Sequence, residues 1–563
     1  MDALTESPAR VRDSQALDPA LPRFLPPTLW SLIVVGLLVR ILRQPTIAGT
    51  YDVRLDELLY AGQRLLEGQW LFNGLVNGTQ PLVQLLYAPS AWLGSLTAHR
   101  LLILAINLLG GILLARALRH FGAAGLIRLR PDSIVPLLGG AVFVVLGQMF
   151  PGALSGQPVQ FANGFLVLGM HAVSRLVAQS PRPVRQSGPE QMLVGAALVL
   201  AMLCSPALVS PLLMLVVLVL MLLPHPLVRL PPLLAGGLAA AALCFGPYLF
   251  LPAGVSLAWA GAVQLPLEWS VRFSPEVDRL MPVLAEFFST NVAGLPIWLL
   301  VVVPILGLIS LTVRQWRLPV FRARADRVLL IPVLTVIFLV ELLLSLQRGD
   351  LEKGDLLLVV LPLLLIMTCG FGEMEARPRS IRWIARVVML GMLLIFLNNT
   401  FVSSVLNAPR RPKPLVLALE ADRTAARRYL AALAPEERRF TAPQDVALQR
   451  QLRQPATTVG IGPKWSLNQQ DLVASWATRR LDLPTSPESA CRQLTDPGNR
   501  HLVWMRTDPV GPNTEAFLRR CLQREPGLWQ DISEDLGLRS RQYRVFRRLA
   551  PPPATAGGAV QSS

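Results

Sequence analysis

Charged residues are scarce in this chain, and their scarcity excludes an ordinary soluble protein. Only 16% of the 563 residues are charged, whereas soluble domains carry roughly 25%. Hydrophobic residues make up 52% of the chain, with a mean hydropathy of +0.46, and they occur in long blocks. Long apolar blocks are the pattern of transmembrane helices. The composition therefore predicts an α-helical polytopic membrane protein.

Nucleotide-binding signatures are also absent from the sequence. Neither a P-loop nor a Rossmann glycine fingerprint occurs, which argues against an ATP-driven pump and against a soluble type of nucleotide-sugar enzyme. The chain has 5 histidines, and they are scattered without the spacing of a metal site. The histidines therefore supply no candidate metal ligands.

The net charge is +17, and much of the positive charge falls in alternate short loops between the apolar blocks. In a soluble protein this charge would favour nucleic-acid binding. In a membrane protein, basic loops mark the cytoplasmic side and contact anionic headgroups, so we expect a lipid bilayer and no nucleic acid as partner. The N-terminus is expected on the cytoplasmic side of an inner (plasma) membrane. The arginines that set this orientation are Arg116, Arg119, Arg128, Arg130, Arg175, Arg182, Arg185, Arg314, Arg317, Arg322, Arg324, Arg327, Arg377, Arg379, Arg382 and Arg386.

About 11 spans are expected, each near the ~20 residues that cross the hydrocarbon layer. Residues 1–27 are polar and Pro-rich and are expected to be disordered. The run 82–93 is too short to cross, and a crossing there would place every later arginine cluster outside, so we expect an interfacial or re-entrant helix. The first external loop then spans 44–98. The expected spans are 28–43, 99–118, 133–150, 158–177, 190–205, 207–223, 231–251, 294–313, 328–346, 355–372 and 383–403.

The composition changes after the transmembrane domain, which is expected over residues 28–403. An odd number of spans places residues 404–550 outside the cytoplasm, as a mixed α/β domain, and the tail 551–563 is expected to be disordered. Cys491 and Cys521 lie in this segment and could form a disulfide there. Helical patterns occur at 417–433, 468–480 and 514–523, and strand-like runs at 457–460, 501–506 and 543–546.

The stretch 51–81 is the place near the membrane where carboxylates, aromatic residues and turn residues occur together. Asp52, Asp56 and Tyr60 are spaced by four residues, so on a helix they share one face. Glu57 follows Asp56 directly and points elsewhere. This pattern favours an active-site loop that begins with an acidic helix.

Four short motifs follow one another in an order that resembles the GT-C superfamily of polytopic glycosyltransferases. That superfamily includes protein O-mannosyltransferases and lipid A aminoarabinose transferases. The first motif is the Asp-Glu pair soon after the first span, with a Tyr four residues on. The others are Gly156-Gln157 at the start of a span, the Pro-Tyr before the large central loop, and the late turn with its Pro-containing span at 347–367. The resemblance implies a GT-C fold.

The resemblance also implies the reaction. A GT-C enzyme of this type transfers a sugar, with inversion, from a polyprenyl phosphate or diphosphate to a hydroxyl on an envelope glycan, lipid or protein. A carboxylate must accept the proton of the attacking hydroxyl, and donor groups must stabilise the leaving phosphate. Asp56 matches the superfamily's Asp and is the predicted base, with Asp52 as the second candidate. Whether these two aspartates hold a divalent metal is an open question, and no metal ligand is assigned.

The remaining site residues follow from the same resemblance. Glu57, Tyr60 and Gln80 are predicted to bind substrate, and Arg348 and Lys353 to bind the phosphate. The chain departs from the superfamily at Gln80 and its neighbours, because many relatives carry a basic residue there. That departure puts in question which residues of this chain supply positive charge to the site.

Two other classes of function are alternatives to the glycosyltransferase hypothesis. A secondary transporter or lipid flippase should show internal repeats and intramembrane charges near the midplane, and this chain shows little of either. A non-catalytic envelope assembly factor would keep the same fold with incidental carboxylates. A transfer assay with polyprenyl-phosphate sugars separates these classes.

Overall fold

The computed structural model of the protein divides into two compact units. The first unit consists of residues 1–45, 99–243 and 273–409, and the second of residues 46–98, 244–272 and 410–563. The structure describes residues 25–43, 53–73, 80–124, 126–127, 129–130, 133–149, 158–178, 187–204, 215–216, 219, 226–265, 291–292, 295–296, 336, 357–375, 379–405, 414–442, 445–453, 475–483, 486–505, 512–524, 527–540 and 543–549.

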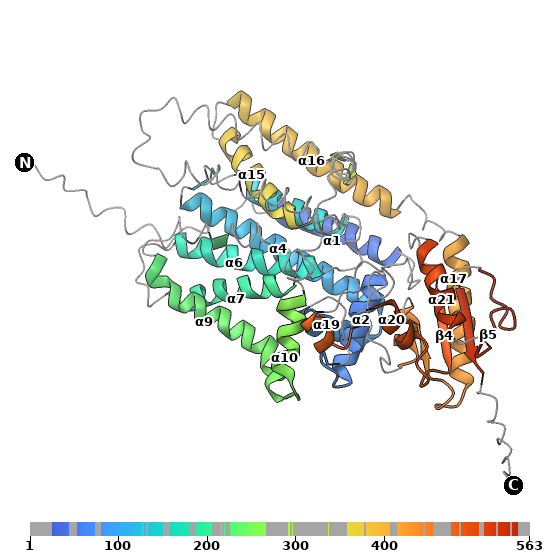
Figure 1. Ribbon diagram of the computed structural model, residues 1–563. Coiled ribbons are helices and arrows are strands. Elements are labelled where there is room, and N and C mark those ends of the chain that lie inside the picture. The colour runs from blue at the N-terminus through green and yellow to red at the C-terminus, as the bar shows by residue number, and fades with distance from the viewer. Residues whose placement is uncertain are drawn as a thin grey trace, which may run out of the picture. The chain divides into compact units, whose positions relative to one another are not determined.

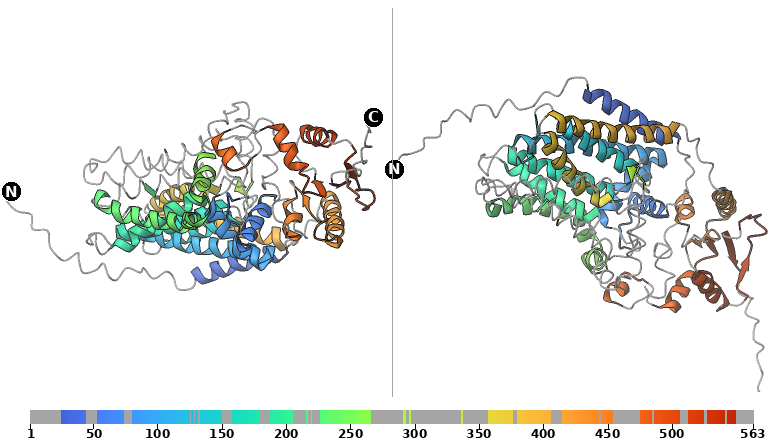
Figure 2. Two further views of the ribbon diagram at one scale, coloured as in Figure 1. Left: turned by 60° about the horizontal axis from the view of Figure 1, so that its bottom comes forward. Right: turned by 90° about the horizontal axis from the view of Figure 1, so that it is seen from above.

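Long apolar helices make up the described part of the first unit, and they run alongside one another (Figures 1 and 2). Helix α6 packs along α7, and α1 packs along α16. A short antiparallel pair, β1 (Asn291–Val292) with β2 (Leu295–Pro296), belongs to the same unit. The helices are α1 (Leu25–Arg43), α4 (Leu96–Ala123), α5 (Val135–Met149), α6 (Pro158–Ala178), α7 (Gly188–Cys204), α9 (Pro226–Phe245), α15 (Leu357–Glu375) and α16 (Arg379–Val405).

Glycines allow the closest helix crossings of this unit. A Cβ added to Gly195 of α7 would lie 1.8 Å from the carbonyl oxygen of Leu233 on α9, and one added to Gly236 of α9 would lie 1.9 Å from the carbonyl oxygen of Met192. Helices α4 and α5 approach in the same way at Gly111 and Gly140. Membrane helices gain packing by such small-residue contacts, because the lipid provides no hydrophobic drive between them.

Many of the expected spans are helices in the structure. The expected spans at 28–43, 99–118, 133–150, 158–177, 190–205, 231–251, 355–372 and 383–403 coincide with described helices to within a few residues at most ends. By length and apolar composition, three described helices could cross a membrane, at Leu96–Ala123, Pro158–Ala178 and Val228–Phe250. The expected spans at 207–223, 294–313 and 328–346 lie largely outside the described residues, so the number of spans stays a prediction.

The second unit contains short helices from the first loop and from residues 244–272, and a small sheet with its helices from the C-terminal part. From the first loop come α2 (Val53–Leu66) and α3 (Pro81–Leu93). From 244–272 come a 3-10 helix η5 (Gly246–Phe250), α10 (Gly254–Trp259) and a π-helical turn η6 (Ala260–Gln264). The C-terminal elements are α17 (Pro414–Ala432), β3 (Phe440–Thr441), α18 (Val446–Gln451), α19 (Trp476–Arg480), α20 (Pro487–Leu494), β4 (His501–Met505), α21 (Pro512–Gln523), β5 (Trp529–Asp531) and β6 (Tyr543–Arg548).

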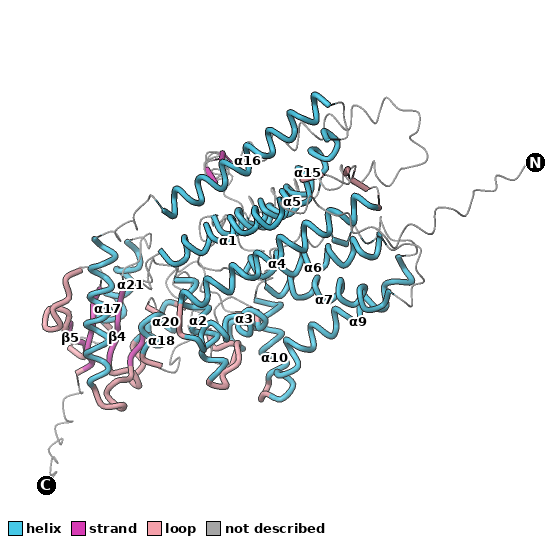
Figure 3. Tube along the Cα trace, turned by 180° about the vertical axis from the view of Figure 1, so that it is seen from behind, coloured by secondary structure: helices cyan, strands magenta, loops and turns pink. Residues whose placement is uncertain are grey.

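The sheet has four strands in the order β3-β4-β6-β5, and helix α17 packs on it (Figure 3). Strand β3 is parallel to β4, and the other neighbours are antiparallel. Side chains alternate between the two faces, as the strand period requires. Val503, Met505 and Val545 pack with residues of α17 on one face, whereas Leu502 and Phe546 pack with residues of α20 and α21 on the other.

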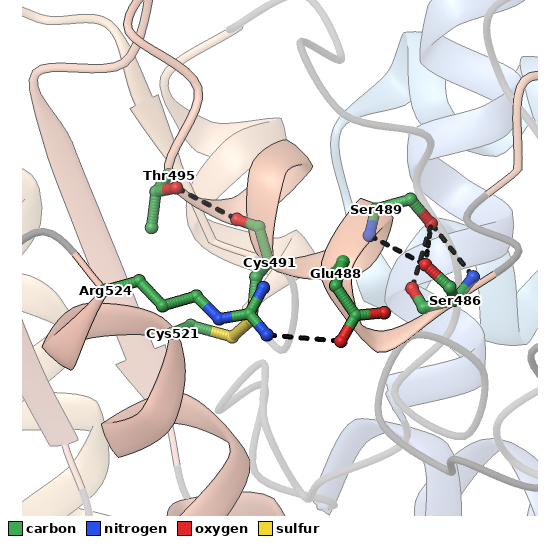
Figure 4. Close-up of a disulfide and its surroundings, with 7 residues drawn as sticks. All are labelled: Ser486, Glu488, Ser489, Cys491, Thr495, Cys521 and Arg524. Carbon is green, nitrogen blue, oxygen red and sulfur yellow. Dashed lines mark hydrogen bonds and ion pairs between the residues drawn. A yellow bond between two sulfur atoms is a disulfide. The ribbon is translucent and has the colours of Figure 1, made fainter.

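A disulfide joins α20 to α21, the two helices that pack on the second face (Figure 4). Cys491 and Cys521 are 30 residues apart in sequence, and their Cα atoms are 5.2 Å apart. Ser486 begins α20 as a capping box with Ser489. The bond therefore fastens two helices that also meet through a small apolar cluster and through an ion pair between Arg524 and Glu488.

The helices and strands expected in the C-terminal part are present where the structure describes them. Helix α17 corresponds to the pattern at 417–433 and α21 to that at 514–523, while β4 and β6 begin at the expected residues. Helix α19 occupies the end of the pattern at 468–480, and the strand-like run at 457–460 lies outside the described residues. The boundaries of this domain and its location outside the cytoplasm stay predictions.

We predict that Gly195→Ala destabilises the protein, because its Cβ would collide with the backbone of α9. Overpacking of this kind costs about 1–3 kcal/mol. The matched control is Gly391→Ala on α16, where an added Cβ meets nothing within 4 Å. Thermal unfolding in detergent should show a lower melting temperature for Gly195→Ala alone. Equal melting temperatures for the two variants would contradict the close crossing.

Candidate functional site

The candidate site begins at the first turn of α2, where Asp56 lies. A carboxylate at this end of a helix is favoured by the partial positive charge of the free N–H groups. One turn later Tyr60 points inward, with 2% of its surface exposed. Gly62 allows α3 to cross α2 closely, since an added Cβ would lie 2.7 Å from the backbone of Tyr87.

Gln80 begins α3 and ties it to the segment 244–272. Its backbone is extended, and Pro81 follows at the first helical position, where the missing N–H of proline costs nothing. The buried Gln80 side chain donates from Nε2 to the carbonyl oxygen of Ala262 in η6, at 3.0 Å. The amide of Gln80 therefore holds the start of α3 against η6.

Gln84 is the central hydrogen-bonding residue of the loop. Its Nε2 donates to the carbonyl oxygens of Ala61 and Gln69, at 3.0 Å each. Its Oε1 accepts from the backbone N–H of Leu71 at 2.9 Å. The side chain is fully buried, so these backbone groups would have no water to replace it. Gln84 thus joins the end of α2, the turn after it and α3.

An aromatic cluster holds the turn after α2. Tyr248 of η5 donates its hydroxyl to the carbonyl oxygen of Leu71 at 2.9 Å, and the rings of Trp70 and Phe72 lie 5.9 and 6.4 Å from its ring. Phe72 has a φ of 68°, which few L residues adopt, and its ring rests on Gly261. The expected Pro-Tyr motif therefore supports the first loop.

The side chain of Asp56 is paired with an arginine from the C-terminal part of the chain. Arg450 of α18 donates from Nη2 to Asp56 Oδ1 at 2.9 Å. The Asp56 side chain is 16% exposed and that of Arg450 is 19% exposed. The pair is shielded enough to be stronger than a surface salt bridge, although neither side chain is fully buried.

Helix α18 is fixed by a buried polar cluster at its first residue. Asp445 caps the helix by accepting from the backbone N–H of Leu448 at 3.1 Å. Its Oδ2 also accepts from Arg423 Nε and from the Tyr543 hydroxyl, both at 2.9 Å. Arg423 comes from α17 and Tyr543 from β6. The sheet and its helix thereby orient the segment that carries Arg450.

Burial raises the pKa of Asp56 above its ordinary value, even though Arg450 and Arg423 lower it. The carboxyl therefore takes up a proton more readily than an ordinary aspartate, which suits a group that accepts one during a reaction. Burial likewise raises the pKa of Tyr60 to about 12, so its phenol stays protonated near neutral pH.

The structure describes only part of the predicted site. Asp56, Glu57 and Tyr60 lie on α2, and Gln80 lies at the start of α3. Asp52, Arg348 and Lys353 lie outside the described residues. No group of three or more His, Cys, Asp or Glu residues that could hold a metal occurs among the residues searched, which are the described ones.

Arg450 and Gln84 were not predicted. Arg450 is one of 53 basic residues and lies 394 positions from Asp56, and nothing in its local sequence marks it. Gln84 lies in the apolar run 82–93, where a single amide is a weak signal. A polar residue inside an apolar interfacial helix could have indicated it, because buried amides need partners.

We predict that Gln84→Met destabilises the loop. The methionine fills a similar volume but removes the partner of the buried Leu71 N–H and the bonds to the carbonyl oxygens of Ala61 and Gln69. A buried group left unpaired costs about 1–3 kcal/mol. The matched control is Gln63→Met on α2, whose amide donates to exposed Glu67. Thermal unfolding should separate the two variants, and an unchanged melting temperature for Gln84→Met would contradict its central place.

Comparison with known proteins gives the fold. No protein-family model and no curated protein matches the chain. The crystal structure of ArnT from Cupriavidus metallidurans in the apo state matches with a TM-score of 0.51 and 14% identity, over 93% of this chain and 99% of that one. The structure of the same protein bound to undecaprenyl phosphate matches with a TM-score of 0.48 and 15% identity, over 93% and 97%. The chain therefore has the GT-C fold of ArnT, a polytopic membrane fold, which confirms the resemblance of its first loop at the level of fold.

Proposed function

We propose that the protein is an integral-membrane glycosyltransferase of the GT-C type. It moves a sugar from a polyprenyl phosphate or diphosphate to a hydroxyl on an envelope glycan, lipid or protein. The observation that carries the proposal is Asp56, a carboxylate of raised pKa at the start of α2, in a chain of GT-C fold. The position of Asp56 matches the superfamily's Asp-Glu motif.

The reaction assigns Asp56 the role of general base. The hydroxyl oxygen of the acceptor attacks the anomeric carbon while its proton passes to an Asp56 carboxylate oxygen. The bond from the anomeric carbon to the phosphate oxygen breaks on the opposite face, and the electron pair leaves with the polyprenyl phosphate. The configuration at the anomeric carbon is therefore inverted. Asp52 is the second candidate for this role.

The other predicted residues take supporting roles. Tyr60 and Gln80 are nearly fully buried, which favours fixing the shape of the loop over direct contact with a sugar. Glu57 is partly exposed beside Asp56 and is the better candidate for a sugar hydroxyl. Arg348 and Lys353 remain the proposed phosphate ligands, because a leaving phosphate needs positive charge.

The proposed location is the outer face of an inner (plasma) membrane. The arginine distribution places the N-terminus in the cytoplasm. The disulfide between Cys491 and Cys521 supports an oxidising compartment for the C-terminal part. A lipid-linked donor would present its sugar at that surface.

The test is transfer of a radiolabelled sugar by the purified full-length protein. Polyprenyl-phosphate sugars and membrane acceptors are supplied to the parent, to Asp56→Asn and to Asp52→Asn. We expect Asp56→Asn to lower transfer by 10²–10⁴-fold, the usual contribution of a general base. The matched control is Glu67→Gln, which removes an exposed carboxylate just after α2 and should leave transfer unchanged.

Two results would contradict the proposal. Full activity in Asp56→Asn would show that Asp56 is not the base, and loss in Asp52→Asn alone would move that role to Asp52. No transfer by the parent from any lipid-linked donor would instead favour a transporter, a flippase or an assembly factor.

A further inference from the structure

The partner of Asp56 comes from a segment that the GT-C motifs of this chain do not include. Those motifs end at residue 367, whereas Arg450 lies on α18 beyond them. The Arg450 Nη2 to Asp56 Oδ1 contact of 2.9 Å is therefore an addition to the loop motif. It supplies positive charge to a loop whose turn at Gln80 lacks the basic residue of many relatives.

We infer that Arg450 is a positioning residue, which holds the Asp56 carboxylate in its charged form and in one orientation, so that helix α18 completes the active site. This inference rests on the proposed function of Asp56. Arg450 acts through Asp56 and needs no contact with the substrate. Asp56 keeps 16% of its side-chain surface exposed, so the pair does not enclose it completely.

The anchoring of α18 makes Arg450 suitable for this role. Asp445 at the start of the helix is held by Arg423 and Tyr543. Gln449 Nε2 also donates to the carbonyl oxygen of Ala442 at 3.2 Å. A guanidinium on such a short, fixed helix loses little freedom when it pairs with a carboxylate, so its orientation is set before substrate binds.

Among the described residues, the charges that shift the pKa of Asp56 come from the C-terminal part, although Glu57 is its neighbour on α2. Arg450 and Arg423 lower the pKa of Asp56, whereas burial and Asp445 raise it. Helix α3, which packs against α2, brings the neutral amide of Gln84. Removing Arg450 would therefore leave burial less opposed and raise the pKa further. A larger fraction of Asp56 would then be protonated at neutral pH and unable to act as a base.

The experiment compares pH profiles of kcat/KM for sugar transfer by the full-length enzyme. An aspartate beside an arginine has its pKa lowered by about 1–3 units, so Arg450→Gln should move the acid limb upward by about 1–3 pH units. At pH values below the acid limb, transfer by Arg450→Gln should be about 10–1000-fold lower than transfer by the parent. The difference should disappear as the pH rises. Arg450→Lys keeps the charge and should keep the limb near that of the parent. The matched control is Arg453→Gln, an exposed arginine just after α18.

The possible failures are distinguishable. A loss in Arg450→Gln that is equal at every pH would show a structural role only and overturn the inference. Arg450→Met removes the charge with a different side chain, and melting temperatures show which neutral variant is folded. If neither folds, Arg450 is structural and the inference is overturned. Absence of transfer in the parent, or full activity in Asp56→Asn, would overturn the proposed function itself.

Discussion

The ion pair between Asp56 and Arg450 is the interaction on which the account of the site depends. It joins the first turn of a helix just after the first apolar segment to a helix 394 residues later. Both side chains are mostly shielded from water, so the attraction is weakened little by solvent and salt. Removing one partner would leave the other charge partly buried and unpaired. An unpaired charge of this kind destabilises the folded protein.

Neutral groups hold the turn after α2, the helix that carries Asp56. Gln84 and Tyr248 hold the turn after α2 through its backbone, and a cluster of apolar residues packs beneath it. That cluster takes residues from the first loop, from 244–272 and from the C-terminal part, including Val446 and Ala477. These groups fix the loop without adding charge, so Arg450 and its neighbours decide the protonation of Asp56.

The sequence predicted the elements that depend on local patterns. Apolar blocks marked many of the helices, short strand-like runs marked β4 and β6, and the Asp-Glu motif marked Asp56. The Pro-Tyr motif marked Tyr248, although its hydrogen bond to Leu71 was not foreseen.

The sequence did not predict the contacts that depend on tertiary folding. Arg450 lies on a helix of only 6 residues, too short for a periodic pattern. Gln84 needed the fold to place backbone groups around its amide. The pairing of Cys491 with Cys521 also stayed open, because sequence separation says nothing about geometry.

A fold shared at 14% identity gives the scaffold, and the chemistry must be tested on this chain's own residues. The most direct test exchanges the two charges, in Asp56→Arg with Arg450→Asp. Thermal unfolding and sugar transfer are then measured beside each single charge reversal. The account predicts that the exchange restores stability over both single variants, while transfer stays absent because the base has moved. An exchanged protein no more stable than the single variants, or one that still transfers sugar, would contradict it.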